Sequence, residues 1–91
     1  MIDINYELYK VFYHVASTLN FSEASKQLYI SQSAVSQSIK TLERKLDQTL
    51  FIRSTKKVQL TPEGEILMRH VEPAMNLIQK GETQLPDAAS T

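Results

Sequence analysis

The sequence predicts a mainly α-helical domain that carries one small β-hairpin, and three patterns lead to this fold class. In the first half of the chain, apolar residues recur at three- and four-residue steps in three segments joined by short links. Two brief β-prone segments then flank a polar turn at residues 54–56. A Thr-Pro-Glu-Gly-Glu run at residues 61–65 finally starts a long helix. This order of elements predicts a winged helix-turn-helix.

The first two predicted helices are short. The first covers residues 6–19, where six apolar side chains share one face, and Asn20 ends it. The second covers residues 23–29 with Ser22 as its N-cap, because serine is a favoured capping residue and an acidic residue follows it. A tight connection then leads to the next helix, as in a helix-turn-helix.

The third helix, predicted over residues 32–46 with Ser31 as its N-cap, has two contrasting faces. On a helical wheel, one face gathers apolar side chains within about 60° of one another: Val35, Ile39, Leu42 and Leu46. The opposite face carries hydroxyls, an amide and two cations but no carboxylate: Ser33, Ser36, Gln37, Lys40 and Arg44. We therefore expect the apolar face to lie in the core and the polar face to meet a polyanion.

The elements after the third helix are a hairpin and a long helix. Residues 49–53 and 57–60 predict the two strands. The helix is predicted over residues 62–80, with Thr61 as its cap and Gly81 as its stop. The expected organisation is a winged helix-turn-helix domain over residues 1–60, a linker or dimerisation helix over 61–81 and a frayed or disordered tail over 82–91.

Pro73 lies inside the predicted long helix. Proline removes one backbone hydrogen bond and crowds the preceding turn. We therefore expect a kink at this position, or two abutting helices.

Charge is unevenly distributed although the net charge is zero. Residues 26–60 contain seven Lys or Arg residues and two carboxylates, whereas the segments on either side are acidic. A local excess of positive charge matters more to a polyanion than the total does. The chain has no cysteine, no apolar run of the ~20 residues that a membrane span needs and no basic leader, so we expect a cytoplasmic protein without a membrane partner.

These features favour double-stranded DNA as the partner. The short side chains at the tip of the third helix suit base edges in the major groove: Gln32, Ser33, Ser36 and Gln37. Cations further along and the starts of two helices suit phosphates: Lys40, Arg44, Ser22 and Ser31. Lys56 of the hairpin is predicted to reach the minor groove, while Arg53 and Lys57 either hold phosphates or brace the turn.

The long helix carries an apolar stripe at helical spacing, with two methionines alongside: Leu67, Met68, Val71, Ala74, Met75 and Ile78. Its first turns are expected to pack on the domain's own core. A helix of ~18 residues spans ~27 Å, which is longer than the rest of the domain can cover. We therefore predict a homodimer that reads a pseudo-palindromic promoter site.

Other functions fit the sequence less well. The two histidines are 56 residues apart and form no metal or catalytic pattern, and the chain has no glycine-rich phosphate loop, so no enzyme activity, metal or cofactor is predicted. A winged-helix module for protein–protein assembly would explain the apolar stripe but would leave the cationic face unused. RNA binding is a third alternative, but the sequence shows no aromatic platform for single strands.

The chain also resembles the N-terminal DNA-binding domain of LysR-type transcriptional regulators over about residues 4–80. Three runs carry the resemblance: FSEASKQLYISQSAVSQSIKTLERKL, LFIRS and LTPEG. The resemblance implies base contacts by Gln32, Ser33, Ser36 and Gln37 and phosphate contacts by Ser22, Ser31 and Lys40. It also implies a minor-groove contact by Lys56 and a subunit-pairing helix from Pro62 onward.

The chain departs from the family pattern at a few positions. Ser25 replaces a usual alanine, Ser33 a frequent proline and Asp47 a common glycine. Gln37 replaces a common arginine, which favours adenine over guanine or weakens reading at that base. Regulators of this kind also carry an inducer-binding domain, so we expect the chain to be a fragment of a longer protein. A tetramer is expected only for that full-length protein.

Overall fold

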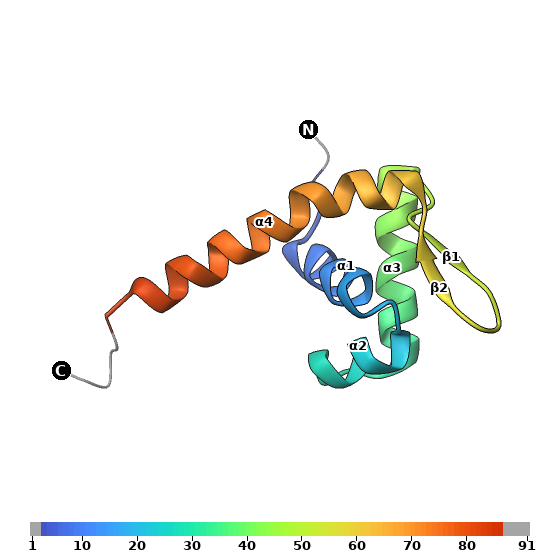
Figure 1. The fold of residues 1–91 in the computed structure, drawn as a ribbon, viewed down its shortest axis with the longest axis horizontal. Helices are drawn as coiled ribbons and strands as arrows, with labels where there is room; N and C mark the ends of the chain where they lie inside the picture. Colours follow the sequence, from blue (N-terminus) through green and yellow to red (C-terminus); the bar gives the residue numbers. More distant parts are fainter. Residues whose placement is uncertain (1–2, 87–91) are drawn as a thin grey trace.

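The computed structural model describes residues 3–86 and contains four helices and one two-stranded sheet (Figure 1). The mainly helical prediction is confirmed, and the elements follow the predicted order. Their bounds are α1 Tyr6–Thr18, α2 Phe21–Leu28, α3 Gln32–Leu46, β1 Phe51–Arg53, β2 Val58–Leu60 and α4 Pro62–Gln84.

The core lies where α1, α2 and α3 meet, and the first strand closes it. Phe12 and Val15 of α1 are fully buried, as are Val35 and Leu42 of α3. The Phe12 ring packs against Phe51 at the start of β1, with 5.5 Å between the ring centroids. The apolar face predicted for the third helix is therefore the face that packs into the core.

The predicted boundary between the first two helices is wrong. α1 ends at Thr18, and Leu19 adopts a left-handed conformation with φ 52°. Asn20 then caps α2, because its side chain accepts a hydrogen bond from the Glu23 amide at 2.9 Å. Ser22, predicted as the cap, lies inside the first turn, because α2 begins one residue earlier at Phe21, whose ring is buried in the core.

The hairpin pairs its strands antiparallel, with Phe51 opposite Leu60. Both strands are shorter than predicted. The carboxylate of Glu43 on α3 accepts hydrogen bonds from the amides of Leu50 (2.7 Å) and Phe51 (3.3 Å). This contact fixes where the hairpin leaves the helical core. Asp47, in place of the usual glycine, has a left-handed conformation with φ 54° at the end of α3.

α4 is one continuous helix that passes through Pro73, so two abutting helices are excluded. The ribbon changes direction along its length (Figure 1). Gly81 does not stop the helix, which continues to Gln84, and residues 82–84 are therefore helical rather than disordered. Residues 87–91 of the predicted tail lie outside the described part of the chain.

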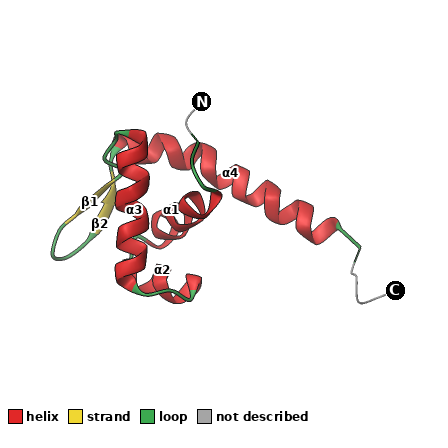
Figure 2. Ribbon diagram, turned by 180° about the vertical axis from the view of Figure 1, so that it is seen from behind, coloured by secondary structure: helices red, strands yellow, loops and turns green. Residues whose placement is uncertain are grey.

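The hairpin and the free end of α4 lie on opposite sides of the helical core (Figures 1 and 2). The described residues extend 51 Å along the longest axis. Within residues 3–86, no helix has both the length and the apolarity of a membrane span. No group of three or more metal-ligating side chains occurs in the same range.

Candidate nucleic-acid interface

The amino-terminal tip of α3 begins at Ser31, as predicted. The Ser31 hydroxyl accepts a hydrogen bond from the Ala34 amide at 3.1 Å and lies 3.1 Å from the Ser33 hydroxyl. The side chains of Gln32, Ser33 and Gln37 are exposed, and Ser36 is half-buried. Four predicted base-reading residues therefore lie in the first two turns of α3, and two of them, Ser33 and Gln37, lie on the side opposite the buried Val35.

Lys40 and Arg44 follow on the same helix, one and two turns further along. Both side chains are exposed. Neither lines the hollow described below, which the tip of α3 shares with the hairpin. The two cations therefore extend the positive surface along α3, away from the tip.

Arg53 contacts both helices of the helix-turn-helix. Its guanidinium carbon lies 3.9 Å from the centroid of the Phe21 ring at the start of α2. Its Nη1 donates a hydrogen bond to the Ser36 hydroxyl at 3.3 Å. The last residue of β1 is thus joined to α2 by a cation–π contact and to α3 by a hydrogen bond.

The turn of the hairpin is closed by its own backbone and one serine. The Ser54 amide donates to the Lys57 carbonyl at 2.9 Å, and the Lys57 amide donates to the Ser54 hydroxyl at 3.2 Å. The side chains of Lys56 and Lys57 are exposed. The hydrogen-bonded turn therefore presents two exposed cationic side chains at the end of the hairpin.

A shallow hollow of about 280 Å³ separates the hairpin from the two helix starts. It brings five predicted site residues together: Ser22, Gln32, Arg53, Lys56 and Lys57. Three of its lining residues are cationic and none is a carboxylate. This sign of charge and the helix ends beside it suit phosphate groups.

Three residues that position the site escaped the prediction. Asn20 caps α2 and lines the hollow, and an Asn followed three residues later by Glu is a recognisable capping signal. Glu43 holds the start of the hairpin through two amides. Phe21 carries the Arg53 guanidinium. No local pattern reveals the last two roles, because they join residues far apart in the sequence.

The predicted dimer stripe on α4 is only partly exposed. Val71 is buried, and three other members pack against the core while partly exposed: Leu67, Met68 and Met75. Ala74 and Ile78 are exposed. Four stripe residues and the first two tyrosines of α1 line an apolar hollow of about 300 Å³: Tyr6, Tyr9, Val71, Ala74, Met75 and Ile78.

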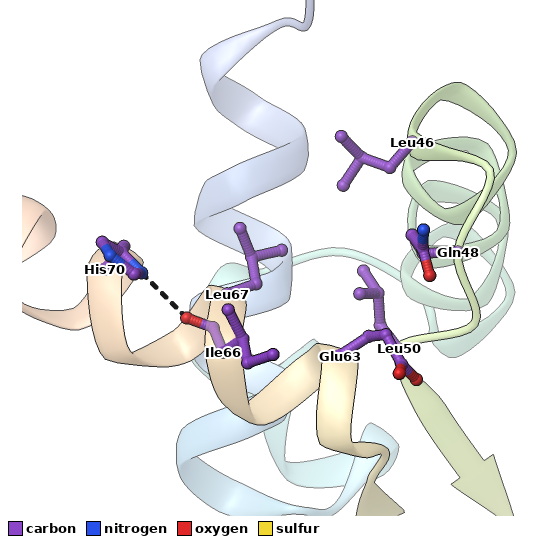
Figure 3. Close-up of a pocket in the computed structure, with 7 residues that line it drawn as sticks. All are labelled: Leu46, Gln48, Leu50, Glu63, Ile66, Leu67 and His70. Carbon is purple, nitrogen blue, oxygen red and sulfur yellow. Dashed lines mark hydrogen bonds between the residues drawn. The ribbon is translucent and has the colours of Figure 1, made fainter.

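A second apolar hollow, of about 340 Å³, lies between the first turns of α4 and the end of α3 (Figure 3). Leu46, Leu50 and Leu67 line it, together with Ile66, which is 51% exposed. His70 borders both hollows, and its Nδ1 donates to the Ile66 carbonyl at 2.9 Å. α4 thus presents apolar surface on both sides of His70.

A family model described as "Bacterial regulatory helix-turn-helix protein, lysR family" matches residues 6–65, which run from α1 through the hairpin into α4. The chain belongs to the LysR family. The resemblance of the three sequence runs is thereby confirmed, together with the winged helix-turn-helix fold.

Known proteins of the LysR family support the same assignment. The HTH-type transcriptional regulator PerR of Escherichia coli is 42% identical over 74 residues, which are 81% of this chain and 25% of that protein. Oxidised OxyR of Corynebacterium glutamicum superposes with a TM-score of 0.84 at 29% identity, over 91% of this chain and 27% of that one. The chain therefore spans about a quarter of the length of the curated relatives it matches.

The similar structures include complexes with DNA. The CbnR_DBD–DNA complex superposes with a TM-score of 0.78 at 25% identity, over 89% of this chain and 93% of that one. The similarity covers nearly the whole CbnR_DBD chain, so the two folds agree over most of both chains.

Proposed function

We propose that this LysR-family domain binds double-stranded DNA sequence-specifically and regulates transcription. The observation that carries the proposal is the placement of the free tip of α3 and the basic hairpin on two sides of one cationic hollow. A helix tip of this kind enters the major groove while a hairpin beside it follows the adjacent backbone and minor groove. The regulator would act on chromosomal DNA in the cytoplasm, and the proposal assigns no catalytic step to any residue.

Each predicted residue has a role in this proposal, and Arg53 braces the hairpin against α2 and α3. The base-reading residues are Gln32, Ser33, Ser36 and Gln37, whose amides and hydroxyls match base-edge donors and acceptors. Lys40, Arg44 and Lys57 bind phosphates, and Lys56 enters the minor groove. Ser31 already accepts a hydrogen bond from Ala34, so it would use its O–H to donate to a phosphate. Ser22 would contact a phosphate at the start of α2.

A selection of bound duplexes from a random pool, followed by titrations across a salt series, tests the proposal. We expect a base preference and an affinity that falls as salt rises, because phosphate contacts release counterions. Lys56→Ala should lower the salt slope by about one unit. Lys80→Ala, which removes an exposed lysine on α4, is the matched control and should leave the slope unchanged.

Gln32→Ala should relax the preference at one base pair by about 1–3 kcal/mol. Gln79→Ala, on the exposed part of α4, should not. Binding without salt dependence and without base preference would contradict the proposed function. A dimer that ignores duplex DNA would instead favour the protein-assembly alternative.

We further propose that two copies pair through α4 and the start of α1. The apolar side chains around the two hollows support this pairing, and Leu77 (67% exposed) and Ile78 (44% exposed) add to the same helix. A second copy is the economical partner for such a surface, since pairing about a two-fold axis covers both copies at once. Two α3 tips fixed in this way would read a pseudo-palindromic promoter site.

A further inference from the structure

Arg53 differs from the other cations of the interface because its side chain is already engaged. Phe21, the ring beneath it, is only 6% exposed and meets Phe51 edge-on at 6.2 Å. A planar guanidinium stacked on a fixed ring has a fixed orientation, which a lysine ammonium would not have. The stacking therefore aims the Nη1 donor of Arg53 at the Ser36 hydroxyl.

The hydrogen bond from Arg53 changes what Ser36 offers to a ligand. A serine hydroxyl has one donor and two acceptor sites, and the Arg53 N–H occupies one acceptor site. No other side chain among residues 3–86 bonds to Ser36, so its O–H is available to donate outward. The guanidinium charge beside Oγ also repels an approaching amino hydrogen. Ser36 is therefore biased toward donating.

We propose that Arg53 is a positioning residue that makes Ser36 a hydrogen-bond donor toward the major groove. Ser36 would then select a base-edge acceptor, such as purine N7, guanine O6 or thymine O4, over the amino groups of adenine and cytosine. This inference rests on the proposed DNA-binding function. It assigns no phosphate contact to Arg53, so the phosphate contact of the hairpin belongs to Lys57, while Lys56 enters the minor groove.

The test compares Ser36→Ala, Arg53→Gln, Arg53→Lys and the double variant Ser36→Ala/Arg53→Gln on duplexes chosen by selection with the wild-type protein. Arg53→Gln should weaken the preference for an acceptor at the same base pair as Ser36→Ala does, by about three- to tenfold. The double variant should lose no more than Ser36→Ala alone. Arg53→Lys should not restore the preference, because its ammonium lacks the stacked fork.

The salt series distinguishes a positioning role of Arg53 from a direct contact between Arg53 and a DNA phosphate. Arg53→Gln should keep the wild-type salt slope, whereas Lys56→Gln, the matched control in the same hairpin, should lower it by about one unit. A lowered slope with an intact base preference for Arg53→Gln, or full rescue by Arg53→Lys, would overturn the positioning role. Circular dichroism of each variant excludes unfolding. Wild-type protein that binds no duplex would instead overturn the proposed function.

Discussion

α3 and α4 are both amphipathic helices that begin at a hydroxyl cap, yet their apolar stripes are buried to different extents. Most of the α3 stripe is covered by its own chain: Val35, Ile39 and Leu42 are at most 3% exposed, and Leu46 at the end of the helix is half-buried. On α4 only the first part of the stripe packs on the core, and its last member, Ile78, is exposed to solvent together with the neighbouring Leu77. Helical periodicity therefore identifies a face that is to be buried, but it does not say what buries it.

The first prediction concerns the buried stripe of α3 and has the largest effect on stability. Leu42→Ala should lower the free energy of unfolding by about 2–5 kcal/mol, because it removes a fully buried side chain and leaves a cavity. Leu77→Ala is the matched change on exposed α4 and should alter that free energy by less than about 0.5 kcal/mol. Urea unfolding at one fixed, low protein concentration measures both. Equal losses would mean that Leu77 is as well buried as Leu42.

The second prediction concerns the exposed part of the α4 stripe. Ile78→Asp should raise the dissociation constant of the proposed dimer by about tenfold or more, since it would place a charge in an apolar contact. Gln79→Asp adds the same charge at the next position and serves as its control. Sedimentation velocity over a concentration series gives the constants. An Ile78→Asp protein that associates like the wild type would remove α4 from the pairing surface.

The third prediction sharpens the comparison at the two caps. Thr61 is buried, accepts from the Gly64 amide at 3.0 Å and donates to the Thr49 carbonyl at 2.6 Å. Ser31 caps α3 from an exposed position. Thr61→Ala should therefore cost about 2 kcal/mol of stability and Ser31→Ala about 1 kcal/mol. Thermal unfolding compares the two variants, and an equal or larger cost for Ser31→Ala would show that burial does not strengthen the cap.

The smallest expected effect concerns how each helix ends. Asp47→Gly should stabilise the domain by about 0.5–1 kcal/mol, because glycine adopts the left-handed end of α3 without strain. Gly81→Ala should raise the helix content of α4, since Gly81 is helical and an added Cβ meets nothing within 4 Å. Destabilisation by Asp47→Gly would show that the aspartate side chain itself holds this turn.

Most of the fold followed from local signals. The cap and both faces of α3, the hairpin and the Thr61–Pro62 start of α4 were predicted from residues a few positions apart, and the structure confirms them. The start of α2 was not, because Asn20 and Ser22 are both good caps and local preference does not separate them. Burial of the Phe21 ring selects Asn20.

Local patterns were enough to predict which residues form the polar face of α3, where positive charge gathers and which family motif the chain carries. The folded structure was needed to show that Arg53 lies on Phe21 and bonds to Ser36, and that α4 continues past Gly81. The contacts of Arg53 escaped prediction because they act over a longer range. Periodicity, capping and charge act between near neighbours in the sequence. The position of the Arg53 side chain instead depends on residues 17 or more positions away, which come into contact only after the chain has folded.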